Sequence, residues 1–382
     1  MTNSSNEHVG VADLRLRRAR VVAFYLPQFH QIPENDRWWG EGFTEWTNVK
    51  AAKPLYPGHS QPRIPTSLGY YNLLDSDVRV AQANLAHEYG IEAFCYWHYW
   101  FGNGRRLLER PFKEVLESGK PDFPFCLCWA NESWTGIWHG APKHILVEQT
   151  YPGEQDSKRH FETLLPAFLD KRYFKIEGKP LFAVYKPEKL PNAEEFVGNW
   201  QRMAREVGLP GLFLVAMSNS PQASYLKPFD AVVNHGPGDF LERAKTRQFF
   251  SRFLRYIFRG RIAEFFPLKL KSYVRRPLRF SFNEVVENVL PDMGNGERFL
   301  PCVLAGWDNT PRSGYRGVVF EGFSPELFRH CLRKAFRRVE NNPLERRLVF
   351  IKAWNEWAEG NYLEPDTLYK YNLLEEIRKE VF

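Results

Sequence analysis

The 382-residue chain has few cysteines and no long apolar run. Its N-terminal stretch MTNSSNEHVGVADLRLRRARVV lacks the continuous apolar core of a signal peptide, and no run approaches the 18 residues that a membrane span needs. We therefore expect a cytoplasmic chain. The five cysteines include no CxxC pair and show no His/Cys ligand spacing, so the sequence predicts buried reduced thiols and no metal site. Four of them lie in apolar, strand-like runs: Cys95, Cys126, Cys128 and Cys302.

Motifs for nucleotide binding are also scarce. No GxGxxG turn follows the first apolar run, which argues against a Rossmann arrangement. The sequence LDSD at 74–77 formally contains a DxD pattern, but it directly precedes a helical pattern at 77–89, where Asp75 or Ser76 would act as the N-cap. No diphosphate cradle and no cofactor site is then visible, and a transferase that uses a free nucleotide sugar loses support.

Aromatic residues are unusually abundant. Hydrophobic residues make up 43% of the chain and charged residues 25%, which is enough for a packed core and excludes a disordered chain. Aromatic residues reach 16%, with 12 Trp, and many of these stand beside Glu, Asn and His. Such clusters point towards a ligand surface more than towards packing.

Eight short apolar runs alternate with helical patterns along the chain. Near-continuous apolar runs of this kind are typical of buried parallel strands in βα units. Eight of them predict an α/β fold of the (β/α)8 TIM barrel type, formed as a single domain over 1–382. The runs lie at 20–30, 91–100, 123–132, 180–187, 212–219, 230–236, 299–309 and 347–360, and helices are expected at 77–89, 156–169, 193–207, 325–340 and 368–380.

Each apolar run changes to polar or aromatic residues at its C-terminal end. Active sites of this barrel lie at that end of the strands, so the shared change predicts one pocket. The residues that we expect in or around its wall are His30, Tyr96, Trp97, His98, Trp100, Trp129, Asn131, Glu132, Trp134, Tyr185, Lys186, Asn219, Asn234, His235, Trp307, Asp308, Asn355, Glu356 and Trp357.

The stretch AWNEWAEGNYLEP at 353–365 carries the strongest chemical signal. Asn-Glu occurs at the exits of the third and eighth runs, with Glu132 and Glu356, and two carboxyl groups are what glycoside cleavage requires. Glu356 and Glu359 are three residues apart, so a helical turn would bring them onto one face, whereas a continued strand would separate them. If they are close, like-charge repulsion would raise one pKa and produce an acid beside a base. Glu132 is a further candidate for catalysis or for support of the pair, and an ion pair with Arg or Lys is its simpler interpretation.

A long connection at 31–76 follows the first run, and its segment NDRWWGEGFTEW suggests a subsite wall. Tryptophan faces stack on a pyranose while carboxylates bind its hydroxyl groups. A lid that packs its own aromatic residues explains the segment equally well. The candidates are Trp38, Trp39, Glu41, Glu45 and Trp46.

Several long motifs carry a family resemblance. WNEWAEG followed by LEPD, together with WWGEGFTEWTNV, GHSQPRIP and CWANESWT, resembles the WbsX-type family of bacterial surface-polysaccharide (O-antigen and capsule) clusters, over roughly residues 20 to 370. That family is itself similar to glycoside hydrolase family 99. The resemblance implies a barrel that acts on sugars with retention of configuration. It implies that Glu356 is the base at the sugar 2-hydroxyl, giving a 1,2-anhydro intermediate, and that Glu359 is the acid and then the base at the leaving oxygen.

Alternatives remain open at this point. The WbsX group is commonly labelled glycosyltransferase, so transfer from a lipid-linked or nucleotide donor competes with hydrolysis. A non-catalytic glycan-binding barrel is a third alternative, although it need not keep both Glu356 and Glu359. The expected partner is in every case a glycan.

The excess positive charge of the chain is concentrated in one segment. The net charge is +7, but residues 241–280 hold 12 Lys and Arg against 2 Glu, so the remainder is slightly acidic. This segment belongs to a predicted basic aromatic insertion at 237–297, between the sixth and seventh strands. Alternating Phe and Arg suggest peripheral contact with the inner membrane surface, while a packed helix with a solvated Arg face explains the same pattern. Nucleic acid is not expected as a partner because no recognised binding module accompanies the charge.

Overall fold

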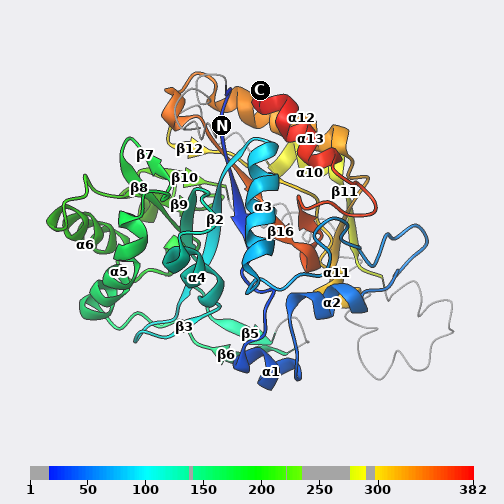
Figure 1. Ribbon diagram of the computed structural model, residues 1–382, viewed down its shortest axis with the longest axis horizontal. Coiled ribbons are helices and arrows are strands. Elements are labelled where there is room, and N and C mark those ends of the chain that lie inside the picture. The colour runs from blue at the N-terminus through cyan, green and yellow to red at the C-terminus, as the bar shows by residue number, and fades with distance from the viewer. Residues whose placement is uncertain (1–16, 137–140, 221, 235–275, 290–296) are drawn as a thin grey trace, which may run out of the picture.

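The protein is described from a computed structural model that places residues 17–136, 141–220, 222–234, 276–289 and 297–382. Its centre is a parallel barrel with helices outside, which confirms the predicted fold class (Figure 1). The strands follow one another in the order β12, β10, β9, β8, β4, β2, β1, β15 and β13. The ring strands are β1 (Arg20–Tyr25), β2 (Ile91–Trp100), β4 (Phe125–Trp129), β8 (Lys179–Val184), β9 (Phe213–Met217), β10 (Ala231–Val233), β12 (Phe299–Leu300), β13 (Cys302–Leu304) and β15 (Leu348–Lys352).

The seventh predicted run supplies two of these strands. β12 pairs with β10 and β13 pairs with β15, so the ring closes through residues 299–304. Pro301 separates the two halves, and it has no backbone N–H to donate to a neighbouring strand. Its carbonyl oxygen still accepts a hydrogen bond from Phe350 N at 2.9 Å. The eight predicted runs therefore correspond to the eight positions of the ring.

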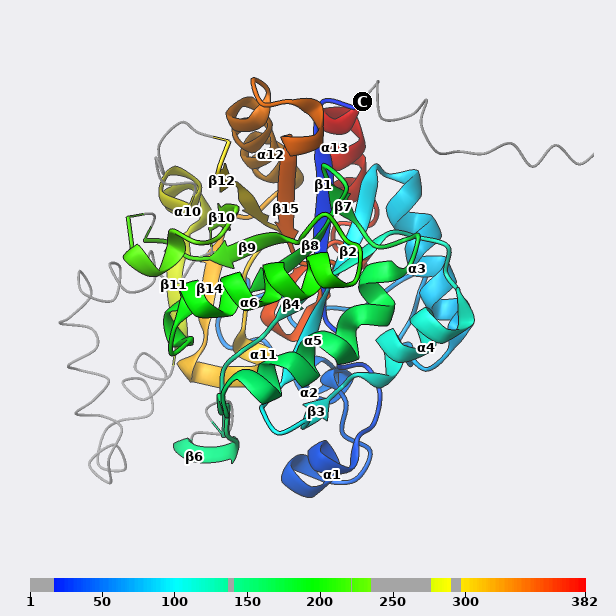
Figure 2. The ribbon, with the colours of Figure 1, turned by 90° about the vertical axis from the view of Figure 1, so that its left-hand side faces the viewer.

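The strands are buried on both faces because helices cover the outside of the ring. β1, β4 and β9 are buried at every residue, as their uninterrupted apolar sequences predict. All five cysteines are buried and free. Figure 2 shows α5 and α6 side by side on the outside of the sheet. The covering helices are α3 (Ser76–Glu88), α4 (Arg110–Ser118), α5 (Glu154–Leu169), α6 (Ala193–Glu206), α12 (Pro325–Val339) and α13 (Asn372–Val381).

The DxD pattern at 74–77 lies at the N-terminus of α3, where its first aspartate is the N-cap. The Asp75 side chain accepts a hydrogen bond from Asp77 N at 2.9 Å, so the aspartate acts as a helix cap, as expected. Ser324 and Asn192 cap α12 and α6 in the same way. No helix in the described part of the chain is both long and apolar enough to cross a membrane.

The long connection after β1 lies at the end of the barrel to which the β1 arrow points (Figure 1). It contains two short helices, α1 (Pro33–Trp39) and α2 (Glu45–Ala51). The basic insertion lies largely outside the described residues, but its end is placed and pairs with a later strand. The short elements of the described chain, outside the barrel strands and the covering helices, are α1 (Pro33–Trp39), α2 (Glu45–Ala51), β3 (Arg106–Leu107), β5 (Trp134–Gly136), β6 (Ala141–Val147), β7 (Lys175–Ile176), β11 (Leu278–Ser281), α10 (Phe282–Val289), α11 (Thr310–Ser313), β14 (Val318–Glu321), β16 (Asn355–Glu356) and β17 (Asn361–Tyr362), with 3-10 turns η3 (Pro187–Lys189), η4 (Ser224–Leu226), η6 (Gly314–Arg316), η7 (Leu344–Arg346) and η8 (Trp357–Glu359).

Candidate active site

A cavity of about 200 Å³ lies at the C-terminal ends of the strands and carries three carboxyl groups on its wall. They belong to Glu132, Glu356 and Glu359, and they follow β4 and β15 as the sequence predicts. Four of the predicted aromatic residues share this wall: Trp39, Trp97, Trp134 and Tyr185. The sequence analysis did not predict several other lining residues, among them Gln28, Tyr99, Arg312 and Lys352.

Glu356 lies deep in the cavity and is only 5% exposed. Trp97 Nε1 donates a hydrogen bond to Glu356 Oε1 at 2.9 Å. Burial raises the pKa of Glu356 well above its usual range, and the negative charge of Glu359 raises it further, while Lys352 acts in the opposite direction. In the absence of substrate, the carboxyl group of Glu356 is therefore the one that retains a proton near neutral pH.

Glu359 is the more exposed member of the pair, with 16% of its side chain accessible. Burial alone would raise its pKa, but the cations of Arg312 and Lys352 lower it below the ordinary value. Arg312 Nη1 donates to Glu359 Oε1 at 2.6 Å, and Arg312 Nε donates to Glu45 Oε1 at 2.7 Å. A buried arginine thus bridges two carboxylates, and its positive charge stabilises the ionised form of Glu359.

A single turn of 3-10 helix, η8, brings the two glutamates together, which answers the question that their spacing left open. Their carboxyl groups are close enough to share a proton, and each one shifts the pKa of the other. The turn ends at Gly360 with φ of +59°. A Cβ atom there would lie 2.8 Å from the Asp308 backbone nitrogen, so both the backbone angle and the close contact require glycine.

Buried polar groups behind the cavity fix this loop, and several predicted wall residues belong to them. Asn355 is fully buried; it donates to Leu26 O at 3.0 Å and accepts from Leu26 N at 2.7 Å. Trp357 is also fully buried, and Trp46 packs against it. The prediction that Asn355, Trp357 and Trp46 line the pocket is wrong, because each is turned into the core.

Glu364 is the buried carboxyl group that anchors the loop from behind. It accepts hydrogen bonds from Trp357 Nε1 and Gln82 Nε2, both at 2.6 Å, and from Tyr71 OH at 2.8 Å. Burial raises its pKa to about 7, although these donors act to lower it. Because the folded-state pKa exceeds the ordinary value of 4.5, this group contributes stability that is complete below pH 4.5 and is lost as the pH rises through 7.

Replacing Glu364 with Gln should therefore flatten the pH dependence of stability. Between pH 4.5 and 8 we expect the free energy of unfolding of the unmodified protein to fall by about 3 kcal/mol more than that of Glu364→Gln, because the variant has no proton to lose. Urea unfolding at a series of pH values measures both slopes. Glu117→Gln, at a side chain that is 62% exposed, is the control and should keep the original slope. Parallel slopes for Glu364→Gln and the unmodified protein would contradict this account.

Strand periodicity excludes other predicted residues from the cavity. Trp97 and Tyr99 of β2 line it, so the alternate residues Tyr96 and His98 face outward. Tyr96 packs on Tyr25, and the His98 imidazole bonds that of His160 at 2.8 Å. Burial lowers the pKa of His98 to about 3, so it stays neutral. The prediction that Tyr96 and His98 bind substrate is wrong.

Three further predicted residues lie outside the main cavity. His30 and Trp129 are buried away from the main cavity, and the Trp129 indole donates to Trp100 O at 2.9 Å. Asn131 is fully buried and bonds both backbone groups of Lys186, which positions the next loop. These three residues do not line the cavity, so their prediction as substrate contacts is wrong.

The segment after β1 is divided between the pocket and its support. Trp39 lines the cavity, and Trp38 packs on Trp134 with 6.0 Å between ring centroids. Glu41 is exposed to solvent, and Glu45 is fully buried in the Arg312 bridge. The prediction that these two carboxylates line the pocket is therefore wrong. Trp307 and Asp308 line a separate, second cavity. His235 lies outside the described residues.

Arg312 and Lys352 are charged cavity residues that sequence reasoning missed. Lys352 ends β15 and is only 7% exposed, and its pKa is raised by Glu356 and Glu359 against the effect of burial, so it stays charged. Its position as the last residue of an apolar strand was the available signal. Arg312 lies in the short helix α11, in a polar stretch without any motif, and its partner Glu45 is 267 residues away.

Comparisons with known proteins agree with this architecture. Residues 21–377 match the family described as glycosyltransferase WbsX. The proteins named WxcX from two strains of Xanthomonas campestris pv. campestris are 36% identical over 364 residues, which is 94% of this chain and 49% of theirs. The chain thus spans about half the length of the curated relatives it matches.

Solved structures show the same fold at low sequence identity. A glycoside hydrolase-like protein superimposes with a TM-score of 0.58 at 14% identity, covering 98% of this chain and 97% of its own. The GH99 endo-alpha-mannosidase from Bacteroides thetaiotaomicron gives 0.53 at 14% identity, covering 94% and 96%. The family model matches most of the chain, so the chain belongs to the family described as glycosyltransferase WbsX.

Proposed function

We propose that this chain breaks or transfers a glycosidic bond of a bacterial surface polysaccharide, with retention of configuration, and that Glu356 and Glu359 carry the chemistry. The observation that supports this most is the pair itself. Two carboxyl groups on one cavity wall have pKa values shifted in opposite directions, so one is protonated while the other is ionised. An acid beside a base is what glycosidic-bond chemistry needs.

The roles within the pair follow from depth and from the resemblance to family 99. Glu359 is the more exposed carboxyl group, and it would donate a proton to the leaving oxygen and then activate the incoming hydroxyl or water. Glu356 is deeper, beside Lys352 and Trp97, which favour a carboxylate that accepts the proton of the sugar 2-hydroxyl. In the ligand-free protein the proton rests on Glu356, so substrate binding would have to pass it to Glu359.

The aromatic wall supports a sugar ring as the ligand. Trp39, Trp134 and Tyr185 face the same cavity as the carboxyl pair. Flat indole and phenol faces stack on the apolar face of a pyranose, while charged groups bind its hydroxyl groups. Glu132 shares the wall, and burial raises its pKa, with Lys186 and Lys352 acting against this. We assign it to substrate binding or to support of the pair.

Transfer is the second candidate, and the family description favours it. Its donor would be a lipid-linked or nucleotide sugar. Isolated surface glycans and nucleotide sugars, each incubated with the protein and analysed by mass spectrometry, separate the two reactions. Shortened glycans in water indicate hydrolysis, and extended acceptors indicate transfer. If neither substrate changes, the chain is a glycan-binding barrel and the catalytic proposal is wrong.

Peripheral membrane contact remains a proposal from the sequence, because most of segment 241–280 lies outside the described residues. If it docks on anionic lipid at the inner membrane surface, binding to anionic vesicles should fall with rising salt, since each basic residue contributes about 1 kcal/mol and salt screens it. Cosedimentation with anionic and neutral vesicles measures this. Changing Arg252, Arg255, Arg259 and Arg261 to Gln should release the protein; equal recovery in both supernatants would contradict the proposal.

A further inference from the structure

A second cavity, of about 270 Å³, lies beside the candidate active site and shares a wall with the catalytic loop. Asp308 and Gly360 line it, and Asp308 N donates to Glu359 O at 2.6 Å, so the turn that carries Glu359 forms the partition. The volume lies just below the roughly 300–1,000 Å³ range of small-molecule pockets, which suits about one sugar ring. Its rim is open to solvent at Gly58, Ser60 and Leu368.

Aromatic rings form much of the wall of this second cavity. Tyr56 stacks on the His59 imidazole with 4.5 Å between centroids and 8° between planes. Arg279 covers the Tyr56 ring at 4.7 Å. Phe323 and Tyr369 meet edge to face at 5.5 Å. Flat rings around a cavity of this size are the kind of surface on which a pyranose stacks.

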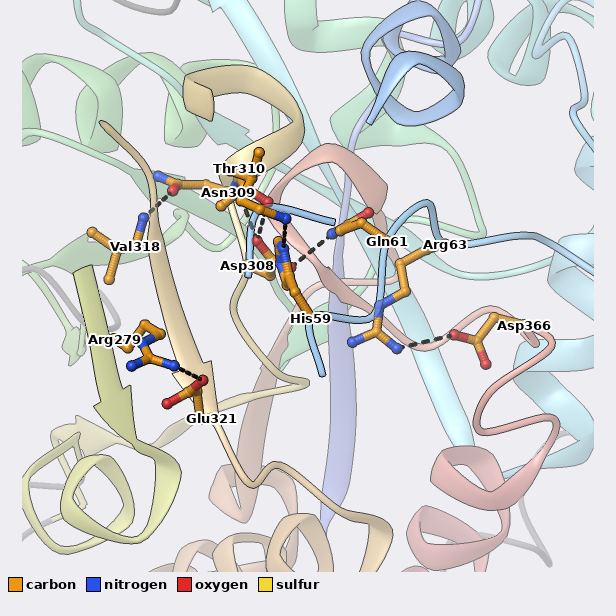
Figure 3. A network of polar contacts seen from close by, with 11 residues as sticks. His59, Gln61, Arg63, Arg279, Asp308, Asn309, Thr310, Val318, Glu321 and Asp366 are labelled. Atoms are coloured by element: carbon orange, nitrogen blue, oxygen red, sulfur yellow. Dashed lines mark hydrogen bonds and ion pairs between the residues drawn. The ribbon is translucent and has the colours of Figure 1, made fainter. Parts of the chain in front are cut away.

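Most charged groups around the second cavity are already paired at hydrogen-bond distance (Figure 3). Asp308 Oδ2 bonds His59 Nε2 at 2.8 Å and accepts from Gln61 Nε2 at 2.7 Å. Arg279 Nη1 donates to Glu321 Oε1 at 3.2 Å. These pairs fix the wall and leave little charge for a ligand.

Arg63 is different, because its carboxylate partner is remote. Its Nη1 lies 3.9 Å from Asp366 Oδ2, which is beyond hydrogen-bond distance. Asp366 accepts hydrogen bonds instead from Tyr362 OH and from the backbone nitrogens of Leu368 and Tyr369. Among the described residues, Arg63 Nε and Nη1 have no hydrogen-bond acceptor. The guanidinium also lies over the Tyr369 ring at 5.4 Å, so its unused donors are the two buried nitrogens Nε and Nη1.

We propose that the second cavity binds an acidic sugar unit, with its ring against the aromatic wall and its anionic group on Arg63. Guanidinium groups bind carboxylate and phosphate oxygens with paired, charge-assisted hydrogen bonds, so an arginine with an incomplete partner suits an anionic substituent. This site is separate from the cavity of Glu356 and Glu359, and its occupation does not depend on their catalytic roles.

The test is a calorimetric titration of the intact protein with glucuronate, glucose 6-phosphate and glucose, which measures the affinity for each sugar. We expect at least one of the two anionic sugars to bind at least tenfold more tightly than glucose, and the tighter one identifies the anion as carboxylate or phosphate. Arg63→Gln should lose at least tenfold in that affinity. Arg205→Gln, at an exposed arginine on α6, is the matched control and should lose nothing.

Two further variants keep the test decisive. Trp134→Ala alters the main cavity and should leave the anion-dependent binding unchanged, which separates the two sites. Tyr56→Leu removes one ring of the aromatic wall and should weaken the same ligand, even if Arg63→Gln proves unstable. Equal binding of glucose and both anionic sugars, or undiminished anion affinity in a folded Arg63→Gln protein, would overturn the proposal. Failure of Glu356→Gln to lose turnover would instead overturn the proposed function alone.

Discussion

Replacing either Glu356 or Glu359 with Gln is expected to lower turnover on the glycan substrate by roughly 10²–10⁴-fold, the usual contribution of a positioned acid or base. The amide keeps the size and planarity of the side chain but cannot exchange a proton. Glu356→Gln should change folding and glycan affinity little, whereas Glu359→Gln also removes one carboxylate from the buried Arg312 bridge and should lower stability as well as turnover. Initial rates, thermal unfolding and glycan titration of each variant measure the three quantities.

Glu41→Gln is the matched control for this experiment, because Glu41 is an exposed carboxylate in the same mouth region. Its turnover should remain near that of the unmodified protein. If Glu356→Gln or Glu359→Gln retains near-normal rates, the chemistry belongs elsewhere in the cavity, and Glu132 is then the next candidate.

The Arg312 bridge predicts two shifts of opposite sign in the pH profile of activity. The cation of Arg312 lowers the pKa of Glu359, so Arg312→Gln should move the acidic limb of the kcat/KM profile to higher pH. Glu45 is the second carboxylate on that cation, and Glu45→Gln leaves the full charge of Arg312 to Glu359. The same limb should therefore move to lower pH. Both changes disturb a buried ion pair and should lower stability by about 3–5 kcal/mol.

A purely structural role of the bridge would lower activity in both variants without moving the limb in opposite directions. Arg312→Lys restores the positive charge but not the paired geometry, so it should return the limb towards its original pH with only partial recovery of rate. Full pH profiles of the three variants provide the comparison. Shifts of the same sign for Arg312→Gln and Glu45→Gln would show that Arg312 does not set the charge of Glu359.

The barrel was predictable because its strands carry continuous apolar sequences. The run in β4, FCLCW, is buried at all five residues, and such runs need no knowledge of distant partners to be recognised. The same reasoning does not reveal on which face of a strand a given side chain lies. In β2 the residues at 96–99 are all aromatic or histidine, and only the period of two separates Trp97 and Tyr99 from Tyr96 and His98. Composition cannot say which set faces the cavity.

The site was predictable only where its residues are close in the sequence. Glu356 and Glu359 belong to one turn, so their proximity followed from the spacing once that turn was known. The sequence predicts Glu45 as a ligand contact because its tryptophan neighbours suggest a sugar wall. It is instead buried against Arg312 of the short helix α11, which is 267 residues away in the sequence. A contact across that separation depends on how the connections pack, and no local pattern records it.

The leaving-group dependence of the two glutamine variants tests the central claim most directly. Aryl glycosides of the sugar identified in the glycan assay would be compared, one with a poor phenol leaving group and one with an activated dinitrophenol. The activated group departs without protonation, so Glu359→Gln should recover much of its rate on that substrate, whereas Glu356→Gln should stay slow on both. Recovery in Glu356→Gln alone would reverse the two roles, and equal recovery or equal loss in both variants would contradict an acid and base pair at Glu356 and Glu359.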